Sequence, residues 1–380
     1  MSATTTNTAQ LRLDGWLLGS VVALLLLGLV MVFSSSIAIA EHTLHNSWDY
    51  FIRQLIFAIF SVAVGAFILY VPMIRWQKKA IWFLLIGFFL LLIVLVPGIG
   101  REVNGSRRWI HLGPIALQVS EAVKLCAVLY IADFLSRHRN HVTTSLLGAL
   151  KPIVLLGAMG GLLLLEPDFG AVVVLFVMIL GMMFMAGVQL RWFIILIILG
   201  AVAASGLVII SPYRIARFTG FLHPWDHMYG SGYQLTQSLM AFGRGGVFGV
   251  GLGNSLQKLF YLPEAHTDFL FAIMAEELGF IGVLVVLVLF LIMAWRGTRI
   301  ARAAHLGHAL FEAFLAYGIT FWLSFQVVVN MGVNVGMLPT KGLTLPFMSY
   351  GGSSLVIDCV ALAMLLRIDL ENKMGGRHVR

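Results

Sequence analysis

Long apolar runs recur along the whole chain and constrain its fold more than any other feature. Many of them reach the length of about 20 residues that a helix needs to cross a bilayer, and ten spans fit the chain. The hydrocarbon core offers no water to backbone polar groups, so a spanning segment must satisfy these groups internally. The runs lack the residue-by-residue alternation of a membrane β-barrel. The sequence therefore predicts an all-α polytopic membrane protein with about ten transmembrane helices.

The expected spans are 15–38, 51–73, 80–97, 114–135, 150–165, 170–187, 191–210, 267–295, 309–331 and 346–368. The fifth and sixth are short, so a single broken hairpin within the membrane is an alternative. The first run exceeds the roughly 7–15-residue core of a cleaved signal peptide, and we expect it to remain as a span. The chain is interpreted as one membrane domain, 1–380, with cytoplasmic tails at 1–14 and 369–380 and a large periplasmic loop at 211–267.

Charge placement agrees with a membrane protein. Charged residues make up only 11% of the chain, against about 25% in soluble domains. Most Lys and Arg residues fall on one side if both termini are cytoplasmic, as the positive-inside rule requires. The net charge of +8 therefore follows topology and does not indicate nucleic-acid binding. Cys126 and Cys359 lie inside apolar runs, which argues against both a disulfide framework and a metal cluster.

Some basic residues of the outer loops run against that rule and suggest a function. They include Arg101, Arg107, Arg108, Arg214, Arg217 and Lys341. Arginine suits phosphate recognition, although an Arg107–Arg108 pair could equally touch any anionic lipid. A glycine-rich run at 243–253 can bring backbone N–H groups close to phosphate, and it can also simply form turns. Together these features favour an anionic ligand at the outer face.

Acidic residues at membrane depth usually mark function. Asp268 stands where the eighth span begins, directly after His266 and Thr267. Glu276 and Glu277 follow inside the span. We expect Asp268 to be the central acid, with the other four side chains as candidates for the same cavity.

Three further polar groups lie at or inside spans. Glu121 and Lys124 are three residues apart, so they share a helix face and can pair. A structural ion pair is the preferred interpretation, and catalysis is the alternative. Asp168 follows Pro167 at the turn between the fifth and sixth spans, where it either faces a cavity or caps a helix.

The segment 338–354 contains two prolines and paired glycines, which break a helix at membrane depth. Irregular backbone is tolerated there only when it is buried or lines a cavity. We therefore expect this segment, with Ser349 as a ligand-binding candidate, to face the same cavity as Asp268.

Five motifs together resemble the SEDS family (shape, elongation, division, sporulation), and the resemblance covers essentially the whole chain. They are Gly105-Ser-Arg-Arg-Trp109, Val119-Ser-Glu121-Ala-Val-Lys124, Glu166-Pro-Asp168-Phe-Gly170, Tyr261-Leu-Pro-Glu-Ala-His-Thr-Asp268-Phe269 and Leu338-Pro-Thr-Lys-Gly-Leu-Thr-Leu-Pro-Phe-Met-Ser-Tyr-Gly-Gly-Ser-Ser354. The last is more similar to the cell-division branch than to the elongation branch. The family often has Gln at Glu166 and Pro at Val119. The first departure argues against an essential role for Glu166.

The resemblance implies a peptidoglycan glycosyltransferase that polymerises lipid II into glycan strands at the periplasmic face during division. Asp268 aligns with the acid that the family is thought to use, here as general base. The implied partners are lipid II, a class B transpeptidase (the division penicillin-binding protein) and the FtsQ–FtsB–FtsL complex. The implied location is the septum of the bacterial inner membrane. No cofactor is evident. The leaving pyrophosphate would need outer-loop cations or a divalent ion, Mg or Mn.

Two other classes of function fit part of the pattern. A flippase or transporter of lipid-linked precursors would also use ten spans, intramembrane charge and broken helices. A non-catalytic division scaffold would tolerate neutral substitutions at every polar position of the cavity.

Overall fold

The computed structural model of the chain describes residues 13–103, 106–113 and 115–375. Its elements, in chain order, are α1 (Gly15–Leu44), α2 (Asp49–Ile68), α3 (Met73–Lys78), α4 (Ala80–Leu95), β1 (Gly100–Val103), β2 (Ser106–Leu112), β3 (Ile115–Gln118), α5 (Val119–Thr144), α6 (Leu146–Leu165), α7 (Phe169–Ala186), α8 (Leu190–Ile209), α9 (Pro212–Leu222), α10 (Tyr233–Gly245), α11 (Leu270–Leu306), α12 (Leu310–Asn334) and α13 (Gly352–Gly375).

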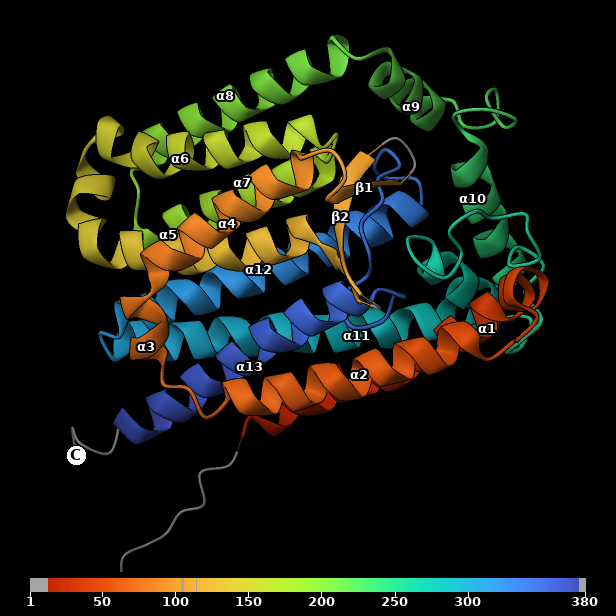
Figure 1. The fold of residues 1–380 in the computed structure, drawn as a ribbon, viewed down its shortest axis with the longest axis horizontal. Coiled ribbons are helices and arrows are strands. Elements are labelled where there is room, and N and C mark those ends of the chain that lie inside the picture. The colour runs from red at the N-terminus through yellow and green to blue at the C-terminus, as the bar shows by residue number, and fades with distance from the viewer. Residues whose placement is uncertain (1–12, 104–105, 114, 376–380) are drawn as a thin grey trace, which may run out of the picture.

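Ten long helices of the described chain lie side by side and correspond one to one with the expected spans (Figure 1). Seven of them are long and apolar enough to cross a membrane, and α4 is a shorter apolar helix. The polytopic helical fold is thus confirmed. The broken-hairpin alternative is wrong, because α6 and α7 are separate helices of 20 and 18 residues.

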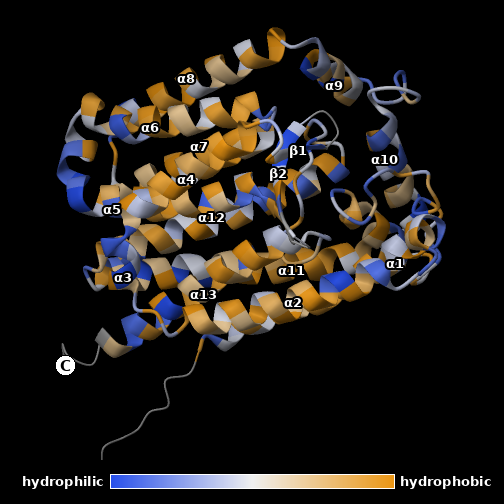
Figure 2. Cartoon of the chain, in the orientation of Figure 1, coloured by the Kyte–Doolittle hydropathy of each residue, from blue (hydrophilic) through white to orange (hydrophobic). Residues whose placement is uncertain are grey.

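Hydrophobic residues run along the lengths of these helices, and hydrophilic residues gather at the two ends of the bundle and in the loops (Figure 2). Helix α8 is the extreme case, because Leu196 is its one buried residue. Such outward-facing apolar surface is stable in lipid and would be unfavourable in water. The hydropathy pattern therefore agrees with a bundle set in a bilayer.

The expected fourth span, 114–135, begins later than the sequence suggested. A three-stranded antiparallel sheet, β1–β2–β3, precedes it, and α5 starts at Val119. Arg101 pairs with Trp109, which in turn pairs with Gln118. Strands this short give little periodicity, so the sequence pattern does not reveal the sheet. Pro114 lies outside the described residues.

Both ends of the described chain lie against the second half of α11. Asp14, at the start of α1, forms an ion pair with Arg296, and Asn372 of α13 donates to the Ile300 carbonyl. The two ends of the described chain are therefore on one side of the bundle, as ten spans would require. Most of the expected N-terminal tail (1–12) and the end of the C-terminal tail (376–380) lie outside the described residues. Helix α13 itself continues to Gly375.

Helix α11 is kinked and locked to the outer loop. Gly279 has a φ of 66°, and a Cβ there would lie 2.2 Å from the Gly249 nitrogen. Only glycine permits this conformation and this approach of two backbones. Val250 N–H donates to the Glu276 carbonyl, and Gly251 N–H to that of Glu277. These two N–H groups of the glycine-rich run therefore bind α11, which favours turns and close packing over phosphate binding as the role of this part of the run.

Candidate active site

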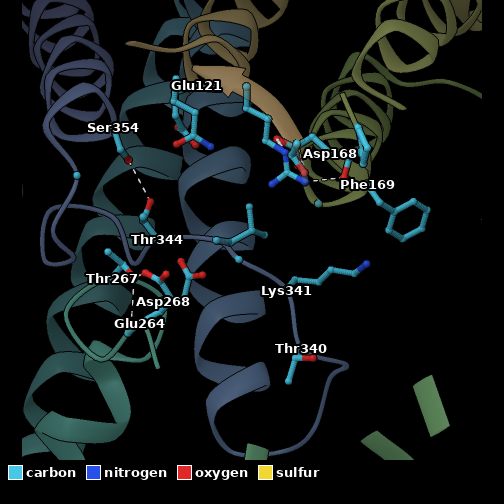
Figure 3. Close-up of a pocket in the computed structure, with 18 of the residues that line it drawn as sticks. Glu121, Asp168, Phe169, Glu264, Thr267, Asp268, Thr340, Lys341, Thr344 and Ser354 are labelled. Carbon is cyan, nitrogen blue, oxygen red and sulfur yellow. Dashed lines mark hydrogen bonds and ion pairs between the residues drawn. The ribbon is translucent and has the colours of Figure 1, made fainter. Parts of the chain in front are cut away.

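A large cavity opens at the end of the bundle where several distant segments meet. Its volume of about 700 Å³ lies within the ligand-pocket range of roughly 300–1,000 Å³. The walls come from β2, the start of α5, the α6–α7 turn, α9, the segment before α11 and the 340–354 segment. Figure 3 shows Asp268, Glu264 and Thr267 on one side, with Asp168 and Lys341 on the other.

Hydrogen bonds to its backbone hold Asp268 in place, and its carboxylate faces the cavity. The Nδ2 groups of Asn330 and Asn334, one turn apart on α12, both donate to the Asp268 carbonyl, at 2.9 and 3.1 Å. A Cβ on Gly342 would lie 2.8 Å from Asp268 Oδ2, so glycine makes room for the carboxylate. No described side chain donates a hydrogen bond to this carboxylate. The fold therefore fixes Asp268 and leaves its oxygens available.

The surroundings of Asp268 favour its neutral form more than water would. Desolvation, with the nearby Glu264 carboxylate as a smaller cause, raises the Asp268 pKa to about 7. Arg108 and Arg217 oppose the shift. A carboxylate whose pKa lies near the working pH can accept a proton and release it again, which suits a general base.

Four cationic side chains line the opposite wall. They are Arg108 of β2, Arg214 and Arg217 of α9, and Lys341. The α9 arginines are anchored at the rim, since Arg214 donates to the Leu207 carbonyl at 2.7 Å and Arg217 to that of Thr340 at 3.2 Å. The remaining guanidinium N–H groups can bind an anion of the size of a diphosphate.

Lys341 is held near this group by the Phe169 ring, whose centroid lies 4.5 Å from Nζ. Burial, together with the positive charges of Arg217 and Arg214, lowers the Lys341 pKa to about 8. An anion that enters the cavity would relieve this repulsion and stabilise the charged form of Lys341. The predicted trio Arg214, Arg217 and Lys341 is thus gathered in one place.

Asp168 has both of the roles that the sequence suggested, since it caps a helix and also faces the cavity. Its Oδ1 accepts from Ala171 N–H at 3.1 Å, which is an N-cap of α7. Its Oδ2 lies 3.8 Å from Arg108 Nε at the cavity wall. Arg108 also donates to the Pro167 carbonyl at 2.5 Å. Asp168 therefore caps a helix and orients an arginine in the cavity.

Glu121 and Lys124 form a buried ion pair at the inner end of the cavity. Lys124 Nζ lies 2.8 Å from Glu121 Oε1 and 2.7 Å from Gln326 Oε1, and it sits over the Trp322 ring. Glu121 lines the cavity, whereas Lys124 is completely buried. The ion pair lies within α5, and the bond from Lys124 to Gln326 joins this helix to α12, which agrees with a structural role.

Arg101 and Arg107 do not line the cavity. Successive residues of a strand point to opposite faces. Arg107 therefore points away from Arg108 and forms an exposed ion pair with Glu102 at 3.4 Å.

Ser349 and His266 support the site from behind. Ser349 Oγ donates to the Thr267 carbonyl at 2.6 Å and accepts from Leu345 N–H. His266 packs between the rings of Tyr50 and Tyr350, and burial lowers its pKa. Thr267 itself lines the cavity, and its hydroxyl donates to Glu264 Oε2 at 2.8 Å.

Glu276 and Glu277 are also absent from the cavity wall, which corrects the expectation that they share it with Asp268. Glu276 pairs with Arg244 at 2.7 Å and also accepts from Ser255 Oγ. Glu277 pairs with Lys258 at 2.7 Å. Both acids are fully buried and hold the loop around 244–258 to α11. They fix the segment that leads to Asp268.

Sequence reasoning did not single out three groups that shape the site. Glu264 lines the cavity with a φ of 56°, a backbone conformation uncommon outside glycine. Asn330 and Asn334 anchor Asp268 from α12. The two asparagines could have been found from the sequence, because two amide side chains four residues apart in an apolar span predict a hydrogen bond to another helix.

Among the described residues, no group of three or more His, Cys, Asp or Glu side chains could hold a metal ion. The expected divalent cation has no such protein site there.

Comparisons with known proteins agree over nearly the whole chain. The family model described as "Cell cycle protein" (FtsW, RodA and SpoVE) matches residues 15–374. A Coxiella burnetii protein named "Probable peptidoglycan glycosyltransferase FtsW" is 52% identical over 97% of this chain and 99% of the relative. A Legionella pneumophila protein of the same name is 51% identical over 97% of this chain and 93% of the relative.

Solved structures show the same fold. A chain from work on structural coordination of polymerization and crosslinking by a peptidoglycan synthase complex aligns with a TM-score of 0.79 and 28% identity. The alignment covers 96% of this chain and 99% of that one. The rod shape determining protein RodA of Thermus thermophilus aligns with a TM-score of 0.70 and 29% identity, over 94% of this chain and 97% of RodA.

Proposed function

This chain belongs to the FtsW, RodA and SpoVE family of cell-cycle proteins, and from that premise we propose that it is a peptidoglycan glycosyltransferase that uses Asp268 as general base. The observation that carries the assignment of the base is its position. Asp268 is a fixed carboxylate with a pKa near 7, and it faces a cavity whose other wall holds four cations. This arrangement suits a glycosyl transfer, because the acid on one wall can take the proton of the acceptor and the cations on the facing wall can bind the departing diphosphate.

The substrate that fits this arrangement is lipid II, a disaccharide-pentapeptide on a polyprenyl diphosphate. A sugar hydroxyl of the acceptor attacks the anomeric carbon of the donor, and the bond from that carbon to the diphosphate oxygen breaks. Asp268 takes the hydroxyl proton as the new glycosidic bond forms. The negative charge that develops on the diphosphate is stabilised by Arg108, Arg214, Arg217 and Lys341. The activated donor supplies the energy, so no nucleotide is required.

We further propose that the chain acts at the division septum of the inner membrane, with a class B transpeptidase and the FtsQ–FtsB–FtsL complex. The similarity to a chain of a synthase complex that couples polymerization to crosslinking supports a crosslinking partner. A divalent cation bound by the diphosphate oxygens is a separate proposal. Loss of activity with a chelator and recovery with Mg or Mn would support it, and full activity in the chelator would exclude it.

The test is a lipid II polymerisation assay on purified protein, with and without the transpeptidase. We expect glycan strands from the native protein and none from Asp268→Asn, whose side chain is nearly isosteric. Asp226→Asn is the matched control, because Asp226 is an exposed acid of the same outer loop that does not line the cavity. Full activity of Asp268→Asn would refute the base assignment. No strands from the native protein, even with its partners, would refute the transferase itself, and a lipid II flipping assay would then test transport.

A further inference from the structure

A second groove lies at the end of the bundle opposite the cavity. Helices α7 and α8 form one wall, and α11 and α12 form the other. Its volume is about 790 Å³. Aromatic pairs line both walls: the rings of Phe184 and Phe193 lie 5.2 Å apart, and those of Tyr317 and Phe321 lie 6.1 Å apart. The groove is therefore apolar over most of its length.

The groove exists because α8 stands away from α11 and α12. Only Leu196 of α8 is buried, and the helix packs mainly on α7 and α9. At the floor, α7 touches α12 directly, since a Cβ on Gly181 would lie 2.6 Å from Phe321 Cδ2. The space above this contact opens toward the surrounding bilayer, so a lipid chain is the natural filling for it.

Two arginines without a carboxylate partner stand at the mouth. Arg299 and Arg302 line the groove from the last turns of α11, and both are exposed. Arg299 lies over the Trp295 ring at 5.3 Å, which leaves its N–H edge free. No carboxylate of the described chain lies within ion-pair distance of either guanidinium. Four other cations at this end have such partners: Arg296 with Asp14, Arg137 with Asp133, Arg367 with Glu371, and Lys373 with Asp369. Others of the described chain, such as Lys78 and Lys79, have no carboxylate within ion-pair distance, but they do not line the groove.

We propose that this groove binds an anionic phospholipid, with its phosphate between Arg299 and Arg302 and an acyl chain along Phe184 and Phe193. The lipid would lie in the leaflet at the end of the bundle that holds Asp14 and Asn372. Charge placement predicts that this leaflet is the cytoplasmic one. Guanidinium groups recognise phosphate through paired N–H donors, and basic pockets between helices on this side suit anionic headgroups. Topology alone accounts for basic residues at this end. Arg299 and Arg302 differ from the other basic residues at this end because they are the two cations of the described chain that line the aromatic groove.

The test is native mass spectrometry of the full chain in detergent, titrated with phosphatidylglycerol or with phosphatidylcholine of the same acyl chains. We expect a saturable site for phosphatidylglycerol alone. The double variant Arg299→Ala, Arg302→Ala should bind it on the order of 30-fold more weakly, from about fivefold per arginine near a membrane surface. Arg299→Lys with Arg302→Lys should bind with intermediate affinity.

The matched control is Lys78→Ala, Lys79→Ala, which removes two exposed cations, the last residue of α3 and the residue that follows it, at the same end of the bundle and away from the groove (Figure 1). It should bind phosphatidylglycerol like the native chain. Equal binding of the two phospholipids, or equal losses in the α3 and α11 variants, would overturn the proposal. Displacement of phosphatidylglycerol by undecaprenyl phosphate at a far lower concentration would also overturn it, in favour of a polyprenyl ligand. A melting curve for each variant shows whether a loss of binding reflects unfolding.

Discussion

Removing the Lys124 charge should destabilise the protein more than almost any other single change. Lys124 is completely buried, and its Nζ donates to Glu121 Oε1 at 2.8 Å and to Gln326 Oε1 at 2.7 Å. Lys124→Met keeps the length of the side chain and leaves Glu121 as a buried charge without compensation. Breaking a buried pair in this way costs about 3–5 kcal/mol. At about 4 kcal/mol the ratio of folded to unfolded protein falls roughly a thousandfold.

The double variant Glu121→Gln, Lys124→Met removes both charges and should recover most of that loss, with a coupling energy of about 2–3 kcal/mol. The assay is the free energy of unfolding in mixed detergent micelles, measured for both single variants and the double. Arg53→Met is the matched control, because the Arg53–Asp49 pair is exposed on α2 and should contribute only about 0–1 kcal/mol. A double variant as unstable as Lys124→Met would refute the buried-pair argument. A stable double variant without polymerisation activity would show that the pair also serves the reaction.

Two further predictions concern the neighbourhood of Asp268, and a third concerns the buried acid Glu166. Glu264 raises the Asp268 pKa, so Glu264→Gln should lower that pKa and move the acid limb of the activity profile to lower pH; an unmoved limb would contradict the electrostatic coupling. Gly342→Ala places a methyl group 2.8 Å from the position of Asp268 Oδ2 and should lower kcat by about 100-fold, the effect of a displacement near 1 Å, with an unchanged melting curve. Burial raises the Glu166 pKa from 4.5 to about 8, so the folded state holds a proton that the unfolded state releases, and stability should fall as pH rises between these values. Glu166→Gln should reduce that fall between melting curves at pH 5 and pH 8.5, and Asp268, whose raised pKa acts in the same direction, should account for part of the fall that remains. An identical fall in the variant would exclude Glu166 as a source.

The helices and the position of the central acid follow from sequence, because both depend on local signals. Apolar length predicts a span wherever it occurs, and Asp268 is conspicuous as an acid at a membrane edge. The contrast between Arg107 and Arg108 shows where such reasoning stops. Only the strand pairing of β2 with β1 decides which of the two adjacent guanidinium groups faces the cavity.

Glu276 and Glu277 show a second limit. The sequence establishes that two adjacent acids inside a span need partners, but the partners, Arg244 and Lys258, come from a loop whose folded path is not encoded in any short pattern. Asn330 and Asn334 acquire their role only when α12 packs against the start of α11. Contacts between distant segments decide these roles, so local periodicity cannot.

The two walls of the cavity differ in how firmly they are attached. The acid wall is tied to α11 and α12 by buried ion pairs, asparagine amides and interlocked glycine backbones. Arg214 and Arg217 instead lie on α9, which follows α8, the helix with a single buried residue, and one hydrogen bond from Arg217 to the Thr340 carbonyl ties them to the rest of the wall. A lateral push on α8 and α9 would therefore widen the cavity toward the bilayer and carry these two cations with it, while Asp268 stayed in place. A long lipid tail could then enter or leave sideways without disturbing the base.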